Sequence, residues 1–345
     1  MDITHGLLIL TILTVFVYDF TNGFHDAADM VATAIASRAI KASVAIAIVG
    51  VFTFLGPLLG GLAVADTLGT FVDMPPADML HAQSLVIAAL LAAVSYNLVT
   101  WYLGLPSSSS NSLAGGLVGA GLYVVGSTHI HWGIDALMQG HLAGVAKVVA
   151  GLFLSPLFGV LAGFVLMKLI RRIFRRFTLR IRPLFVATQY VSIAWLGFSH
   201  GANDAQKGMA IIGMMLLASG QYTHFTIPLW VIVMCTSAIT LGTIFGGWKI
   251  IKTLGFELYH IKLIHSVADQ LGAAIINTLA THIGAPTSTT QVVTATLLGV
   301  GSAEKPSHVR WGRAGQIVLG WLVNLPVSIA LGAFYAWGLI SLLEV

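Results

Sequence analysis

Asn22-Gly23-Phe24-His25-Asp26-Ala27 returns in the second half of the chain as His200-Gly201-Ala202-Asn203-Asp204-Ala205. A second pair of polar stretches follows in the same order: Gly104-Leu105-Pro106-Ser107-Ser108-Ser109-Ser110-Asn111 and Gly284-Ala285-Pro286-Thr287-Ser288-Thr289-Thr290-Gln291. Asn97 precedes the first stretch and Asn277 the second. The chain is therefore a duplication in which the repeated elements are polar.

The composition identifies the environment of these polar elements. Only 9% of the 345 residues are charged, 57% are hydrophobic, and the mean hydropathy is +0.90. Soluble proteins carry about 25% charged residues, so we expect an all-α integral membrane protein. Five apolar stretches approach or exceed the roughly 20 residues that span a bilayer: 42–65, 80–103, 143–169, 226–248 and 314–342. The apolar run at 6–18 lacks a cleavage signal, and we interpret it as a mature helix.

The basic residues predict the topology. Lys and Arg are gathered in four segments, at 38–41, 171–182, 249–262 and 305–313, whereas 66–79, 127–142 and 220–225 contain none. The positive-inside rule makes the first set cytoplasmic and the second external, with both termini external. The net charge of +4 thus reflects topology, and we expect no nucleic-acid partner.

The same rule divides the chain into inverted halves. Residues 1–170 form a first repeat that runs from outside to inside, 171–182 form a basic cytoplasmic linker, and 183–345 form a second, inverted repeat. Inverted repeats with interrupted helices in corresponding places are typical of secondary transporters.

The two Gly-x-Pro stretches interrupt apolar sequence with runs of hydroxyl residues. Proline and non-helical backbone at membrane depth are tolerated only inside protein or beside a wet cavity. We therefore expect two re-entrant or broken helical hairpins, at 105–126 and 285–301. Each tip would present hydroxyls and free amides at a half-helix N-terminus, which favours an anion.

These motifs closely resemble the duplicated signatures of the inorganic phosphate transporter family, in particular its bacterial low-affinity Pit type. Val31-Ala32-Thr33 after the first motif and Gln206-Lys207-Gly208 after the third extend the similarity. The resemblance implies an inverted-repeat bundle that binds inorganic phosphate (Pi) and coupling ions near the midplane. The substrate-binding residues that it implies are Asn22, Asp26, Ser107, Ser108, Ser109, Ser110, Asn203, Asp204, Thr287, Ser288, Thr289 and Thr290.

Phosphate chemistry agrees with this assignment. Hydroxyls and amides donate to the bare oxygens of Pi, while Asp26 or Asp204 can accept from its P–OH group. Sulfate brings no such proton and would leave a buried acceptor unpaired. Two carboxylates beside an anion repel it at low dielectric, so binding requires cations, either sodium or protons.

The coupling cation is left open between these two. Asp29 stands where an Asn is usual in the family, and Asn111 and Gln291 stand where many relatives have His. Asp29 shares a helix face with His25 or Asp26, and these titratable groups favour protons over sodium. The Pit resemblance also favours protons, with a neutral metal–phosphate complex as the carried species. The candidate coupling-ion residues are Asp26, Asp204, His25, Asp29, Asn97, Asn277 and Asp269.

Lys207 follows Asp204 by one helical turn, and we interpret it as the counter-ion of that aspartate; direct contact with Pi is the alternative. We expect no protein-bound metal and no cofactor. No phosphate-binding loop of ATP-driven proteins is present.

The sequence thus predicts a multi-pass symporter of the cell inner membrane that imports Pi by alternating access. A symporter of sulfate or another oxyanion is the alternative. An anion channel conflicts with the duplicated aspartates. An intramembrane hydrolase conflicts with the symmetrical serines, because a nucleophile is normally single. A homodimer is compatible with the sequence.

Overall fold

The computed structural model describes residues 3–69, 79–176, 179–246 and 248–343, and within these ranges it contains helices and no strands. Parts of two expected loops, 70–78 and 177–178, lie outside the described residues, as do 1–2, 247 and 344–345.

Corresponding helices follow one another in the same order in both halves. The first half contains α1 (Ile3–Ala36), α2 (Ala42–Leu59), α3 (Ala63–Gly69), α4 (Met79–Leu103), α5 (Ser109–Val124), η1 (Ser127–His129), α6 (Ile134–Met138) and α7 (Gly144–Ile173). After η2 (Leu179–Ile181), the second half contains α8 (Arg182–Ala218), α9 (Leu229–Phe245), α10 (Trp248–Lys252), the π-turn η3 (Thr253–Glu257), α11 (Leu263–His282), α12 (Thr289–Glu304), η4 (Pro306–His308) and α13 (Trp311–Leu343).

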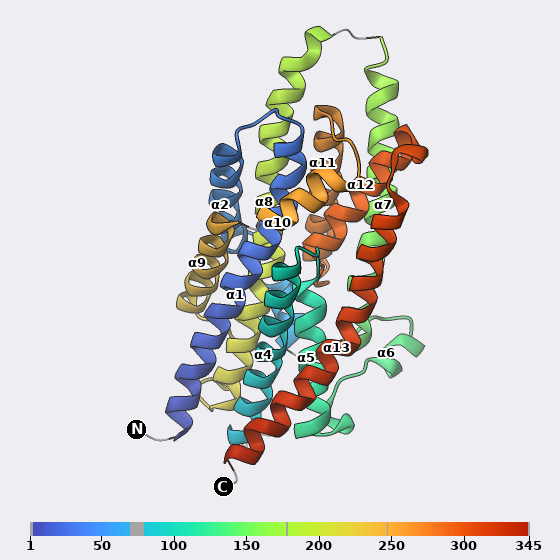
Figure 1. Cartoon of the computed structure of the whole chain (residues 1–345). Helices are drawn as coiled ribbons and strands as arrows, with labels where there is room; N and C mark the ends of the chain where they lie inside the picture. The colour runs from blue at the N-terminus through green and yellow to red at the C-terminus, as the bar shows by residue number, and fades with distance from the viewer. Residues whose placement is uncertain (1–2, 70–78, 177–178, 247, 344–345) are drawn as a thin grey trace.

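The long helices run between two ends of the molecule (Figure 1). The two termini lie at one end together with α6, and the connection between α7 and α8 lies at the other. Within the described residues, five helices are long and apolar enough to cross a membrane, or six if the bent pair of α9 and the segment after it counts as one span. The expectation of a membrane-spanning helical protein is confirmed.

The Asp motifs do not interrupt their helices. α1 continues through Asn22–Asp26 for 34 residues, and α8 continues through the second motif for 37 residues, about 55 Å at the rise of an α-helix. Two helices are shorter than the expected spans. In the expected span 42–65 the first helix ends at Leu59, and in 226–248 the helix covers only Leu229–Phe245.

The two hydroxyl stretches are the tips of helical hairpins, as predicted. α4 ends before Gly104, which has φ 69°, and α11 ends before Gly284, which has φ 67°. A left-handed residue at these positions suits glycine, which has no Cβ to clash. The α4–α5 hairpin enters from the end that carries the termini, and α11–α12 enters from the opposite end (Figure 1). Both tips therefore reach the middle of the bundle.

The two half-helices begin with the same cap. The Ser108 side chain accepts a hydrogen bond from the Asn111 amide, and the Ser288 side chain accepts one from the Gln291 amide. Such caps satisfy one of the amides that lack a partner at a helix start and fix the direction of the first turn. The following residues of each run are thereby aimed at the bundle centre.

Helices of the two halves exchange partners. α1 packs on α9 and α8 packs on α2, while α7 packs on α12 and α13 packs on α5. A Cβ at Gly23 would overlap the Ile239 carbonyl oxygen, and one at Gly201 would overlap the Thr53 carbonyl oxygen. Small residues let membrane helices approach closely, so glycine sets these contacts.

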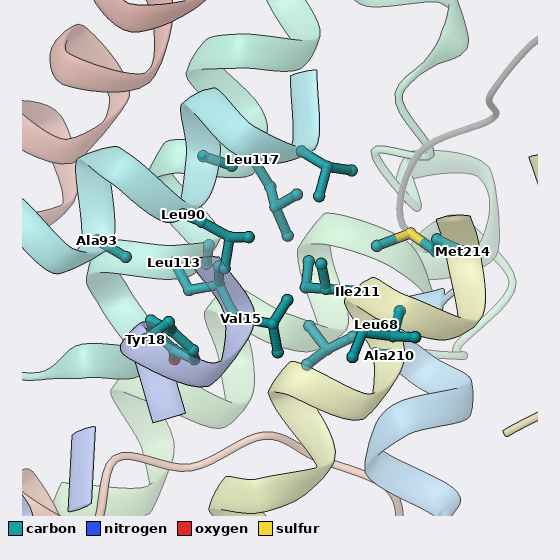
Figure 2. Close-up of a cluster of buried hydrophobic side chains, with 14 of the residues drawn as sticks. Val15, Tyr18, Leu68, Leu90, Ala93, Leu113, Leu117, Ala210, Ile211 and Met214 are labelled. Carbon is teal, nitrogen blue, oxygen red and sulfur yellow. The ribbon is translucent and has the colours of Figure 1, made fainter. Parts of the chain in front are cut away.

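An apolar core packs the first hairpin against neighbouring helices (Figure 2). It joins side chains of α1, α3, α4, α5 and α8, among them Val15, Leu68, Leu90, Leu117 and Ile211, all of them buried. Dense packing resists displacement of single helices, and it holds α1 and α8 at fixed positions against the α4–α5 hairpin.

Polar residues tie the outer ends of the second hairpin. The Tyr259 hydroxyl donates to Glu304 Oε2 at 3.0 Å, and Lys262 Nζ lies 3.5 Å from Glu304 Oε1. Burial and the neighbouring carboxylate raise the pKa of Tyr259 to about 12. The adjoining His265 ring, the Tyr259 hydroxyl and Lys262 outweigh the burial of Glu304 and lower its pKa. The ends of α11 and α12 are thereby held together.

The close approach of α1 and α9 generates a prediction. A Cβ at Gly242 would overlap the Phe20 carbonyl oxygen, so Gly242→Ala should force the helices apart and destabilise the protein by about 1–3 kcal/mol. We expect a lower Tm of the purified protein and a lower yield from membranes. Gly320→Ala on α13 is the control, because a Cβ there meets no atom within 4 Å. Equal Tm values for both variants would contradict the packing described here.

Candidate functional site

Two buried aspartates mark the centre of the bundle. Asp26 on α1 and Asp204 on α8 each have an oxygen in a group with a ring nitrogen of His200, all three atoms within 4.8 Å of one another. The three residues are at most 1% exposed. The structure therefore brings the two repeated aspartates together, as the duplication predicts.

The third hydroxyl of each tip faces the motif of its own half. Ser109 Oγ donates to Asn22 Oδ1 at 2.6 Å and lies 3.5 Å from Asp26 Oδ2. In the second half, Thr289 Oγ1 lies 3.4 Å from Asp204 Oδ1 and 3.1 Å from His200 Nδ1. Asn22 and His200 occupy equivalent positions in the two motifs, so the two sets of contacts match.

The fourth hydroxyl of each tip faces the motif of the other half. Thr290 Oγ1 contacts Asp26 Oδ1 at 2.9 Å and also contacts Asp29 Oδ2. Ser110 Oγ accepts from Lys207 Nζ at 2.5 Å and donates to the Thr287 carbonyl at 2.7 Å. Each half therefore supplies hydroxyls to both aspartate motifs.

Lys207 joins the two tips at the centre. Its ammonium lies 2.7 Å from Asp204 Oδ2 and donates to the Thr287 carbonyl at 3.0 Å. The side chain is 1% exposed. A buried ammonium requires such partners, and these contacts match the predicted role as counter-ion of Asp204.

Asparagine side chains hold the second tip. Asn203 Oδ1 accepts from the Thr287 amide at 3.0 Å, and Asn203 Nδ2 donates to the Ala285 carbonyl at 3.2 Å. Asn277 accepts from Thr287 Oγ1 and donates to Thr289 Oγ1, both at 3.3 Å. The non-helical backbone of this tip is thus fixed by amides of α8 and α11.

Asn324 of α13 does the same for the first tip, and the sequence gave no reason to single it out. Its Nδ2 donates to the Ser108 carbonyl at 2.7 Å and to Ser107 Oγ at 3.1 Å, and its Oδ1 accepts from Ser112 at 3.0 Å. The only signal in the sequence was a polar residue within the apolar stretch 314–342, and the structure shows that its side chain is fully buried. His200 was also missed as a site residue, although it aligns with Asn22.

Two predicted coupling-ion residues lie apart from this network. Asn97 Oδ1 lies 3.5 Å from Ser112 Oγ, and no described residue pairs with its Nδ2. Asp269 is fully buried on α11, and its hydrogen-bonding neighbour is Thr33 of α1 rather than Asp26, Asp204 or a tip hydroxyl. His25, by contrast, lies at the centre, with Nδ1 3.2 Å from Asp26 Oδ1 and Nε2 3.5 Å from Thr100 Oγ1.

The remaining predicted residues have supporting positions. Ser108 and Ser288 cap the half-helices, and Ser107 is bound by Asn324. Asp29 lies one turn beyond Asp26 and forms a second cluster with it and His25, again with one ligand atom from each within 4.8 Å. The site therefore consists of two carboxylate motifs clasped by two hydroxyl tips, with all these residues buried.

Comparison with known proteins places the chain in a family. The family described as "Phosphate transporter family" matches it twice, over residues 22–181 and 175–332. A protein of Rhizobium meliloti strain 1021 is 37% identical over 329 residues, covering 95% of each chain. One of Bacillus subtilis strain 168 is 38% identical over 336 residues, covering 96% of this chain and 97% of the relative. Both bear the name "Probable low-affinity inorganic phosphate transporter".

A further relative and a solved structure agree. The low-affinity inorganic phosphate transporter PitA of Escherichia coli strain K12 is 36% identical over 244 residues, covering 63% of this chain and 47% of PitA. A structure described as "The sodium-dependent phosphate transporter" has the same fold, with a TM-score of 0.83 at 24% identity over 97% of this chain and 99% of that one. This chain therefore belongs to the phosphate transporter family, and it is a membrane transporter rather than an enzyme.

Proposed function

We propose that this protein is a secondary active symporter that imports inorganic phosphate together with cations by alternating access. The observation that carries the proposal is the meeting of two hairpin tips, inserted from opposite ends, at the paired Asp26 and Asp204. The membership in the phosphate transporter family supports the substrate.

Both halves offer donors to a phosphate. Ser109 and Thr289 carry hydroxyls beside the aspartates, and the first amides of α5 and α12 have no acceptor within their own helices. Helix starts also carry partial positive charge that favours an anion. Pi would be held between the tips, with its P–OH proton donated to Asp26 or Asp204, a contact that sulfate cannot make.

Cations are required before an anion can bind here. Asp26, Asp29 and Asp204 are buried together, and Lys207 is the one permanent positive charge among the described residues of this centre. The repulsion between carboxylates and Pi at low dielectric would otherwise exceed the hydrogen-bond energy. Coupling follows, because Pi binds only when the cations are present.

Protons are our preferred coupling cation, with sodium as the alternative. His25 Nδ1 lies 3.2 Å from Asp26 Oδ1, so a proton on one of these two groups has a direct hydrogen-bond partner in the other. The sodium dependence in the name of the solved relative belongs to that protein and keeps sodium as the second candidate. Carboxylates and carbonyls that bind sodium also suit a divalent metal carried with Pi as a neutral complex.

Alternating access would move one hairpin at a time. The tips meet through Ser110, Thr287 and Lys207, and in this proposal these contacts would close the path between the two ends. Withdrawal of the α4–α5 tip would open the site toward the termini, and withdrawal of the α11–α12 tip would open it toward the opposite end. We place the protein in the cell inner membrane, with external termini and with a homodimer as a possible assembly.

The paired aspartates provide the first test of the proposal. Asp26→Asn or Asp204→Asn should abolish concentrative Pi uptake into proteoliposomes while the protein still inserts. The substitution preserves size and removes a charge worth about 2–5 kcal/mol to a buried partner. Ser108→Ala and Thr289→Ala should mainly weaken Pi affinity, because other donors remain. Near-normal accumulation by both Asp→Asn variants would refute the central site.

Asn324 provides a second test, because it positions the first tip without belonging to a motif. Asn324→Leu would leave the Ser108 carbonyl and the Ser107 hydroxyl without this donor, at a cost of about 1–3 kcal/mol per buried group. We expect a KM for Pi raised about tenfold or more. Leu322→Asn, on the exposed part of the same helix, is the control for a change of polarity alone. An unchanged KM in Asn324→Leu would show that the tip needs no such support.

The orientation can be tested with introduced cysteines. The native Cys235 is fully buried and should stay unlabelled by an impermeant maleimide. Thr128→Cys, in the segment free of Lys and Arg, should label in intact cells. Arg175→Cys, in the basic linker, should label only after the membrane is opened. The reverse pattern would place the termini in the cytoplasm.

A further inference from the structure

Asp29 and Lys207 occupy equivalent positions in the two halves. Each lies three residues after the motif aspartate of its helix, Asp26 or Asp204. Each also reaches the fourth hydroxyl of the opposite tip: Asp29 contacts Thr290, and Lys207 contacts Ser110. The pseudo-twofold relation therefore places a carboxylate in one half where the other half has an ammonium.

The ammonium completes the hydrogen bonds of the second half. Lys207 Nζ donates a hydrogen bond to Ser110 Oγ, and Ser110 Oγ in turn donates one to the Thr287 carbonyl at 2.7 Å. The same ammonium lies 2.7 Å from Asp204 Oδ2. The Lys207 ammonium therefore has three acceptors, and its pair with Asp204 has no net charge.

The first half lacks one positive charge. Thr290 Oγ1 carries a single hydrogen but lies against both Asp26 Oδ1 and Asp29 Oδ2. One hydroxyl can donate to only one of two carboxylates, so the other contact needs a proton or a bridging cation. In addition, Asp29 Oδ1 is buried with no hydrogen-bond partner among the described residues, and Asp29 is 0% exposed.

We infer that Asp26, Asp29 and Thr290 form a site for one exchangeable monovalent cation, and that the Lys207 ammonium is the built-in counterpart of this cation in the other half. The inference rests on the proposed symport and deepens it. The exchangeable cation would thus bind in the first half, beside Asp26 and Asp29, and the permanent positive charge of Lys207 lies in the second half. The ligand is a sodium ion or a proton, which carry the same charge.

The surrounding charges agree with this assignment. The other titratable groups near the centre are Tyr18, Asp19 and His25 on α1 and His200, Asp204 and Lys207 on α8. Lys207 lies in contact with Asp204, whereas the groups within 4.8 Å of Asp26 are His25, Asp29, His200 and Asp204, none of which carries a permanent positive charge. Two adjacent carboxylates without a permanent positive charge in contact are therefore the place where an added cation stabilises the centre most.

The number of cations carried per Pi tests the inference. In proteoliposomes, the opposing cation gradient that stops net Pi flux at a fixed Pi gradient gives this number. Asp29→Asn should require one cation fewer than the wild type, and Lys207→Gln one more. The double variant should return to the wild-type number. Separate sodium and pH gradients identify the cation, because the number changes only for the ion that occupies the site.

Two outcomes separate this inference from the proposed symport. Wild-type protein that carries no Pi under either gradient would refute the symport itself. Coupled uptake by the wild type with an unchanged cation number in both single variants would overturn the inference and leave the symport intact. Asp135→Asn, in the exposed helix α6, is the charge-matched control and should behave as wild type.

Cation binding to the purified protein can also be measured in variants that do not transport Pi. Purified wild-type protein should show a Tm that rises with sodium concentration or with proton concentration, because a ligand of the folded state stabilises it. Asp29→Asn should lose this rise, and Asp135→Asn should retain it. A cation response of Asp29→Asn equal to that of the wild type, or no response in the wild type, would overturn the inference.

Discussion

Negative charge in a buried place is the constraint on which the rest of the structure depends. Asp26 and Asp204 are fixed in unbroken helices, cut off from water, and close to each other. Ionised carboxylates in such surroundings are costly unless partners surround them. Three features offset this free-energy cost: the capped half-helices, the hydroxyl runs and Lys207. Each of them provides hydrogen bonds or positive charge to the two motifs. The negative charge that these partners leave uncompensated still attracts cations, whereas a fully neutralised core would not.

The tips can perform this role because their own backbone is secured. Broken helices expose amides and carbonyls that a membrane interior cannot satisfy. Asn203 and Asn277 bind the second tip, while Asn324 binds the first. The two halves therefore solve one problem with different residues. Such differences let a duplicated protein keep its geometry while the chemistry of the two sides diverges, as Asp29 and Lys207 illustrate.

The sequence predicted these elements to different degrees. Duplicated polar motifs in apolar surroundings predicted the hairpin tips and the meeting of the aspartates, because inverted repeats relate equivalent residues through one axis. Asn324 could not be predicted in this way, because it belongs to none of the repeated polar stretches. The Asn97–Asn277 pair looked equivalent in sequence, yet only Asn277 reaches a tip. Which of two similar side chains makes a contact depends on helix rotation, and an apolar stretch carries no signal for that.

The exchange of helices between the halves has a consequence for biosynthesis. Gly23 of α1 is covered by α9, which ends at Phe245, and the first hairpin is covered by α13, which ends at Leu343, so both surfaces lack these neighbours until the second half is made. A ribosome that has delivered the first half to the membrane has produced a segment whose final neighbours do not yet exist. Insertion of α1 must therefore precede its packing on α9 by the time needed to translate the chain as far as Phe245, and insertion of α5 must precede its packing on α13 by the time needed to translate the whole second half. Quality control in the membrane meets a long-lived intermediate with open glycine faces, and a truncated chain would remain in that state permanently.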